Sequence, residues 1–126
     1  MATPTYTPLG SITLSSAESS VTFSSIPQTY RDLILVSNYE CASAGVAGKA
    51  YLNTDTSESS IYSGVRMKGY GSGSGSSNAN GQSIRWEIQT LNAVVVVMQL
   101  MDYSATDKHK TILTRVSAGG TSTYDG

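Results

Sequence analysis

The stretch "AVVVVMQLMDY", residues 93–103, decides the fold. It is the most apolar run in the chain, but it is far shorter than the roughly 20 residues that a membrane-spanning helix needs. Valine favours strands because its branched side chain packs well on a pleated surface. We therefore predict a strand at the centre of the core, and the short segment "LNA" before it (residues 91–93) predicts a tight turn.

The clearest alternation of apolar and polar residues lies just before that run, in "SIRWEIQT", residues 83–90. Ile84, Trp86 and Ile88 face one side of a strand, and the charged and polar residues between them face the other. A period of two residues is typical of a half-buried strand. We therefore predict a strand with one face against the core.

Similar short runs, separated by Gly, Ser, Asn, Asp or Pro, recur at fairly even spacing, which is typical of an all-β sandwich or barrel. Together they predict about eight strands. Four consecutive apolar residues, 33–36, indicate a central strand covered on both faces. No stretch keeps helical spacing over three turns, so no long helix is predicted. The remaining predicted strands are residues 9–14, 20–24, 31–39, 49–53, 62–70 and 110–116.

The first two of these runs show the same alternation as residues 83–90. Ile12 and Leu14 share one face, and Val21 and Phe23 point the same way while Thr22 points outward. After them, Pro27 has no N–H to donate and is expected to end the pairing.

A low-complexity segment, "GSGSGSSNANG", covers residues 71–81. It has almost no apolar side chain to bury, so it predicts a flexible loop. Two interpretations stay open for this loop. It is either a loose hairpin tip or a segment that becomes ordered against a neighbouring subunit.

The length of 126 residues fits one domain. We expect an N-terminal arm (1–10), a β-sandwich domain (11–116) and a polar C-terminal loop or truncation point (117–126). Because a sandwich rarely ends on a polar, glycine-rich segment, we expect either later strands or a closing strand from another chain. An open edge beside a valine-rich sheet would otherwise favour aggregation.

Charged residues make up only 13% of the chain, about half the usual share. The net charge is −1 and no basic block is present, so we expect no nucleic-acid partner. The single cysteine, Cys41, rules out an intrachain disulfide and is expected to be a small, half-buried residue. No signal peptide or membrane helix is recognised, so we expect synthesis in the cytoplasm and no membrane partner.

The most chemically varied stretch is "MDYSATDKHKT", residues 101–111, which holds the only histidine, His109. Ser104, His109 and Asp102 or Asp107 are the residue types of a catalytic triad. However, no Gly-x-Ser-x-Gly elbow is present, and the flanking lysines would disfavour an imidazolium. We therefore predict a polar turn held by its own side chains, or a subunit contact, and no enzyme activity.

No metal or cofactor site is predicted. One histidine and one cysteine, far apart in the sequence, do not supply the three or four ligands of a zinc site. The segment "NTDTSE", residues 53–58, has carboxylates at Asp55 and Glu58 but lacks the calcium-loop pattern, and a solvated turn is the favoured interpretation.

Most of the eight tyrosines fall at predicted strand ends. Packing at the rim of a sandwich is the simplest interpretation. Tyrosine is also enriched at protein interfaces, because it carries a large apolar area and one polar tip, and aromatic residues also line carbohydrate-binding faces.

Two motifs resemble a known family. They are "SVTFSSIP-x-TYRDL-x-LV" (residues 20–36) and "MDYSATDKHKT-x-L-x-R" (residues 101–115). Both resemble small β-sandwich virion proteins of tailed phages, of the cyanophage and marine-phage type. The resemblance implies a jelly-roll-like structural module on the particle and carries over no catalytic residue.

We therefore expect an all-β, jelly-roll-like antiparallel sandwich, completed by another segment or chain where strands are missing. The expected function is capsid decoration, as a cement protein that binds the major capsid protein or other virion proteins. A tail-fibre or receptor-binding module that binds host-surface glycan is the alternative. A homo-oligomer in the virion is expected, with subunit contacts at the N-terminal arm, the 71–81 loop and residues 103–110. The named contact residues are Tyr6, Tyr70, Tyr103, Asp107, Lys108, His109 and Lys110.

Overall fold

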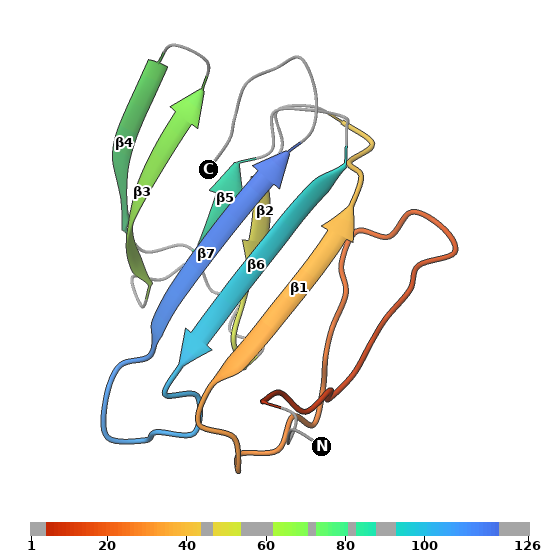
Figure 1. Cartoon of the computed structure of the whole chain (residues 1–126), viewed down its shortest axis with the longest axis vertical. Coiled ribbons are helices and arrows are strands. Elements are labelled where there is room, and N and C mark those ends of the chain that lie inside the picture. The colour runs from red at the N-terminus through yellow and green to blue at the C-terminus, as the bar shows by residue number, and fades with distance from the viewer. Residues whose placement is uncertain are drawn as a thin grey trace.

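The computed structural model of the chain describes residues 5–43, 47–53, 62–70, 73–80, 83–87 and 93–118. These ranges hold seven β-strands and no helix, so the prediction of an all-β chain is confirmed for them (Figure 1). No helix that could span a membrane occurs in the described ranges. The strands are Leu33–Tyr39 (β1), Ala47–Ala50 (β2), Ser63–Tyr70 (β3), Gly73–Asn80 (β4), Ile84–Glu87 (β5), Val94–Met101 (β6) and Thr111–Ala118 (β7).

A three-stranded antiparallel sheet in the order β1-β6-β7 forms the main layer (Figure 1). The valine-rich strand β6 is its central strand, as the sequence predicts. Alternate residues of β6 point into the core, and Val94 and Val96 are fully buried. Burying a valine side chain stabilises the fold by roughly 1.5–3 kcal/mol, so β6 is the main source of core stability.

A second layer consists of the antiparallel pair β2–β5, which lies behind the main sheet in Figure 1. Trp86 of β5 packs against Val94 and Val96, together with Tyr39 and Cys41. The alternation in residues 83–87 is therefore confirmed, since Ile84 and Trp86 are half-buried and Arg85 is exposed. Ile88 lies outside the described residues.

Cys41 is half-buried, as predicted. Burial raises the pKa of its thiol above the ordinary value, which disfavours the reactive thiolate.

The prediction of a central strand at residues 33–36 is wrong, because β1 is an edge strand. Its burial alternates, so that Leu33 and Leu35 are half-buried while Ile34 and Val36 are exposed. Val36 keeps 66% of its side chain exposed. A run of four apolar residues does not by itself show whether a strand lies at the edge or in the centre of a sheet. Both faces of a strand are covered only when another layer packs on each face of its sheet. Within the described residues, the second layer packs on only one face.

The two strands predicted at residues 9–14 and 20–24 are also absent. These residues belong to the N-terminal segment (residues 5–32), which runs beside the sheet as an extended loop in Figure 1. Residues 5–25 make no backbone–backbone hydrogen bond within the described part of the chain. A strand needs a neighbouring strand for its backbone groups, and alternation without such a partner is not sufficient.

The flexible loop predicted at residues 71–81 is wrong over most of its length, because residues Gly73–Asn80 form β4. This strand pairs with β3 along all eight of its residues, from Ser63 opposite Asn80 to Tyr70 opposite Gly73. The backbone ladder needs no apolar side chains, so low hydrophobicity did not exclude a strand here. The hairpin β3–β4 extends from the rest of the fold at the upper left of Figure 1.

Candidate functional site

The loop that joins β6 to β7, residues 102–110, contains most of the charged and polar residues of the stretch 101–111 (Figure 1). Strand β6 ends at Met101, and Asp102 adopts a left-handed backbone conformation with φ of 55°. The turn is closed by a 3.1 Å hydrogen bond from the backbone N–H of Ala105 to the carbonyl of Asp102. The predicted polar turn is therefore present.

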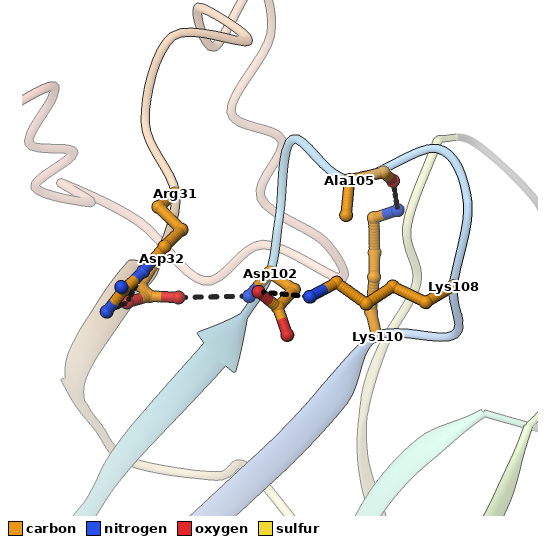
Figure 2. A network of polar contacts seen from close by, with 6 residues as sticks. All are labelled: Arg31, Asp32, Asp102, Ala105, Lys108 and Lys110. Carbon is orange, nitrogen blue, oxygen red and sulfur yellow. Dashed lines mark hydrogen bonds and ion pairs between the residues drawn. The ribbon is translucent and has the colours of Figure 1, made fainter.

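Asp32 connects the start of this loop to the N-terminal segment. One oxygen of its carboxylate accepts a 2.9 Å hydrogen bond from the backbone N–H of Asp102 (Figure 2). The other oxygen accepts two hydrogen bonds from the guanidinium of Arg31, at 2.9 and 2.8 Å. The hydrogen bonds from Arg31, followed by that from Asp102, hold the pKa of the Asp32 carboxyl below its usual range.

Tyr103 adds a second connection to the same segment. Its backbone N–H donates to the carbonyl of Arg31. Its hydroxyl donates to the carbonyl of Ile26 at 3.1 Å and accepts a short hydrogen bond from the side-chain amide of Gln28. Residues 26–32 are thereby held against the β6–β7 loop, although the rest of the N-terminal segment is exposed.

Two lysines of the loop have defined partners. The Lys110 ammonium donates to the carbonyl of Ala105 at 2.9 Å and is half-buried (Figure 2). The Lys108 ammonium lies 3.1 Å from a carboxylate oxygen of Asp102. This ion pair is largely exposed, so it contributes under about 1 kcal/mol to stability.

A cavity of about 320 Å³ opens between this loop, the N-terminal segment and the residues after β2. The loop contributes Tyr103, Thr106, Lys108 and Lys110 among its lining residues. The described lining residues are mainly polar, and none of them carries a carboxylate. They are Gln28, Leu52, Asn53, Tyr103, Ala105, Thr106, Lys108 and Lys110.

Three of the predicted contact residues, Tyr103, Lys108 and Lys110, therefore lie together at one cavity. Asp107 and His109 are exposed on the same loop but do not line it. Tyr6 is exposed on the N-terminal segment and is not among the described lining residues. Tyr70 ends β3, and its side chain is not among those that the structure describes.

Three lining residues lie outside the predicted contact regions: Gln28, Leu52 and Asn53. They come from segments far from the loop in sequence, and no local pattern marks them. One conformational signal exists at Asn53, which adopts a left-handed φ of 55°, since asparagine is enriched in that region. The turn that it forms places residues 52 and 53 at the cavity.

The residues considered for catalysis are not assembled into a triad. Within residues 93–118, no hydrogen bond joins Ser104 to His109, and the partner of Asp102 is Lys108. The expectation that the chain is not an enzyme stays a prediction.

The described residues contain no group of three or more histidine, cysteine or acidic side chains that could hold a metal ion. Asp55 and Glu58, considered for calcium, lie outside the described residues.

A second feature of the protein surface is a set of exposed apolar side chains. On the N-terminal segment, five apolar residues keep 40–48% of their side chains exposed; they are Leu9, Ile12, Leu14, Val21 and Phe23. On β3, Val65 and Met67 are exposed to 76% and 81%. Large exposed apolar side chains are uncommon on soluble monomers when they lie together.

No family model, no curated protein and no solved structure matches this chain.

Proposed function

We propose that the chain is an accessory structural protein of a phage virion, and that it decorates the capsid as a cement protein. The virion assignment rests on the resemblance of residues 20–36 and 101–115 to small phage β-sandwich proteins. The cement mechanism rests on one structural observation about the N-terminal segment. This segment has the sequence pattern of strands, and it pairs with no strand in the described part of the chain.

An assembled particle would supply those partners. In an extended strand, Ile12 and Leu14 would share one apolar face, as would Val21 and Phe23. Residues 5–25 make no backbone–backbone hydrogen bond in the described part of the chain, so they could join the edge of a sheet in a neighbouring subunit. Such strand addition uses main-chain hydrogen bonds for affinity and alternate side chains for specificity. Glu18 is the only charged residue in residues 5–25, so little charge would have to be buried.

The addition of such a strand would also complete the fold. We propose a jelly-roll-like sandwich in which the missing strands come from another segment or another chain. Within the described residues β1 is one of the two edge strands of the main sheet, and its Ile34 and Val36 are exposed. Covering this edge would also remove an aggregation risk.

The mechanism is repeated contact between subunits. A specific interface buries about 1,600 Å² in total. When one chain touches several neighbours, modest contacts combine into strong attachment. Homo-oligomers and contacts with the major capsid protein are both expected in this arrangement.

Immunogold electron microscopy of intact virions tests the assignment, with antibody raised against this chain. Label over the head supports the cement function. Label at the tail end favours the second candidate below, and no label on particles known to admit the antibody contradicts the virion assignment.

A pair of matched variants tests the proposed role of the N-terminal segment. We expect Ile12→Asp with Phe23→Asp to abolish attachment to particles lacking the protein, because charge is placed on the apolar face. Thr13→Asp with Thr22→Asp adds the same charge to the opposite face and should preserve attachment. Equal attachment of both variants contradicts strand addition by this segment.

A second candidate function is a receptor-binding module of a tail fibre. The polar cavity at the β6–β7 loop favours it, because a cement protein has no need of a recess lined by amide, hydroxyl and ammonium groups. A trimeric state in solution and saturable binding of host-surface glycan would support this candidate. Cement activity without glycan binding would contradict it.

A further inference from the structure

We propose that the cavity at the β6–β7 loop binds an acidic monosaccharide unit, such as a uronic acid, with its carboxylate at Lys108 and Lys110. This inference deepens the receptor-binding candidate and rests on it only for the source of the sugar. The binding itself concerns the isolated chain and depends on neither head nor tail location.

The charge of the cavity favours an anion. Among the described residues that line it, two are lysines and none is acidic. The Lys110 ammonium uses one of its three N–H donors on the Ala105 carbonyl, so two donors remain for a ligand. Hydrogen bonds between an ammonium and a carboxylate are roughly twice as strong as neutral ones.

Lys108 is free to contribute despite its ion pair with Asp102. Its side chain is 54% exposed, and the partner carboxylate is 36% exposed. Exposed pairs of this kind are weak, and the lysine chain is flexible. A ligand carboxylate in the cavity can therefore share the Lys108 ammonium with Asp102 at little cost.

The other lining groups indicate a sugar instead of an acidic peptide side chain. Gln28 and Thr106 contribute amide and hydroxyl groups beside the two lysines, and the Tyr103 hydroxyl, which donates its proton to Ile26, can only accept from a ligand. An aspartate or glutamate side chain would occupy only the lysines, whereas a sugar ring also presents several hydroxyls. The volume of about 320 Å³ lies at the small end of the range for ligand sites, as expected for a single ring.

The cavity wall is held in place before any ligand arrives. Tyr103 is fixed by its hydrogen bonds to Ile26, Gln28 and Arg31. Asp32 holds the backbone at Asp102. Fixed side chains reduce the entropy lost on binding, so a small ligand can bind measurably.

The experiment measures binding of glucuronic acid to the full chain by isothermal titration calorimetry, with glucose as the matched neutral sugar. The two ligands differ only in a carboxylate in place of a hydroxymethyl group. We expect saturable binding of glucuronic acid that weakens with added salt, and at least tenfold weaker binding of glucose. Equal affinity for the two sugars, or no binding of glucuronic acid at millimolar concentration, overturns the proposal.

Three variants test whether the lysines of the cavity bind the carboxylate of the sugar. Lys110→Gln and Lys108→Gln should each weaken binding, with about a tenfold loss or more at Lys110. Arg115→Gln removes an equal charge from an exposed position on β7 that does not line the cavity, and should leave affinity unchanged. If Lys110→Gln fails to fold, the exposed Lys108→Gln variant still decides the question. Unchanged binding in a folded Lys108→Gln variant overturns the placement of the carboxylate.

The result of the sugar-binding experiment can be distinguished from the result of the test of the cement function. Sugar binding that depends on the lysines stands even if immunogold label lies over the head. Failure to bind glucuronic acid contradicts this inference and leaves the cement function untouched.

Discussion

The hydroxyl of Tyr39 on β1 accepts a 2.7 Å hydrogen bond from the indole nitrogen of Trp86 on β5. The bond joins the main sheet to the second layer at the point where Trp86 packs against Val94 and Val96. Because the two residues are 47 positions apart, no local pattern predicts their contact. The bond satisfies the one polar group of the indole, which allows the tryptophan to cover the core.

Gly48 is required for the same packing. It lies opposite Trp86 in the β2–β5 pair, and a methyl group at this position would meet the indole ring. We expect Gly48→Ala to lower the free energy of unfolding by about 1–3 kcal/mol, as overpacking usually does. Gly64→Ala is the matched control, since nothing lies within 4 Å of the added group, and it should change stability by less than about 0.5 kcal/mol. Urea denaturation measures both, and equal losses would contradict the packing argument.

The Tyr39 hydroxyl should make stability fall at high pH. Burial raises the pKa of Tyr39, and the hydrogen bond from Trp86 opposes that rise only in part. The folded state therefore keeps the proton when the unfolded state releases it, so the free energy of unfolding falls as pH rises above about 10. Tyr39→Phe should remove this part of the decline, while the part due to Cys41 remains. Identical pH profiles for the two proteins between pH 9 and 11 would show that Tyr39 does not contribute.

Tyr103 should control the mobility of residues 26–32. In Tyr103→Phe the hydroxyl bonds to Ile26 and Gln28 are lost, at a cost of about 1 kcal/mol each. We expect faster proteolytic cleavage in residues 26–32, with little change in β6. Tyr6→Phe makes the same chemical change at an exposed position and should leave the cleavage rate unaltered. Protection that does not change in Tyr103→Phe would mean that the backbone bond to Arg31 is sufficient.

Asp32 should titrate below the ordinary range of about 3.9 for an aspartate. The hydrogen bonds from Arg31 and from the Asp102 backbone stabilise its charged form, so its contribution to folding is present above pH 4 and is lost as pH falls through the lowered pKa. NMR titration of the carboxyl carbon measures the midpoint. Arg31→Gln should move the midpoint up, and Arg115→Gln should not. A midpoint at the ordinary value in the wild-type protein would refute the hydrogen bonds described for this carboxylate.

Strand pattern and pairing were predictable to different degrees. Residues 94–101 and 84–87 are strands as their composition and alternation predict, because both bury a continuous apolar face against their neighbours. Residues 9–14 and 20–24 show the same alternation without becoming strands, and residues 73–80 become a strand without any apolar pattern. In each case the missing information is the position of a partner strand, which a local sequence does not contain.

The residues of the candidate site were also predictable to different degrees. The polar composition of residues 102–110 by itself determined that this stretch would be a loop with charged groups, and the valine run before it determined the central strand of the core. Only the tertiary structure decided that Gln28, Leu52 and Asn53 face Lys108 and Lys110 across one cavity. The physical reason is that propensity and periodicity act within a few residues. Layer packing, edge position and cavity lining depend instead on contacts between segments that are distant in the chain.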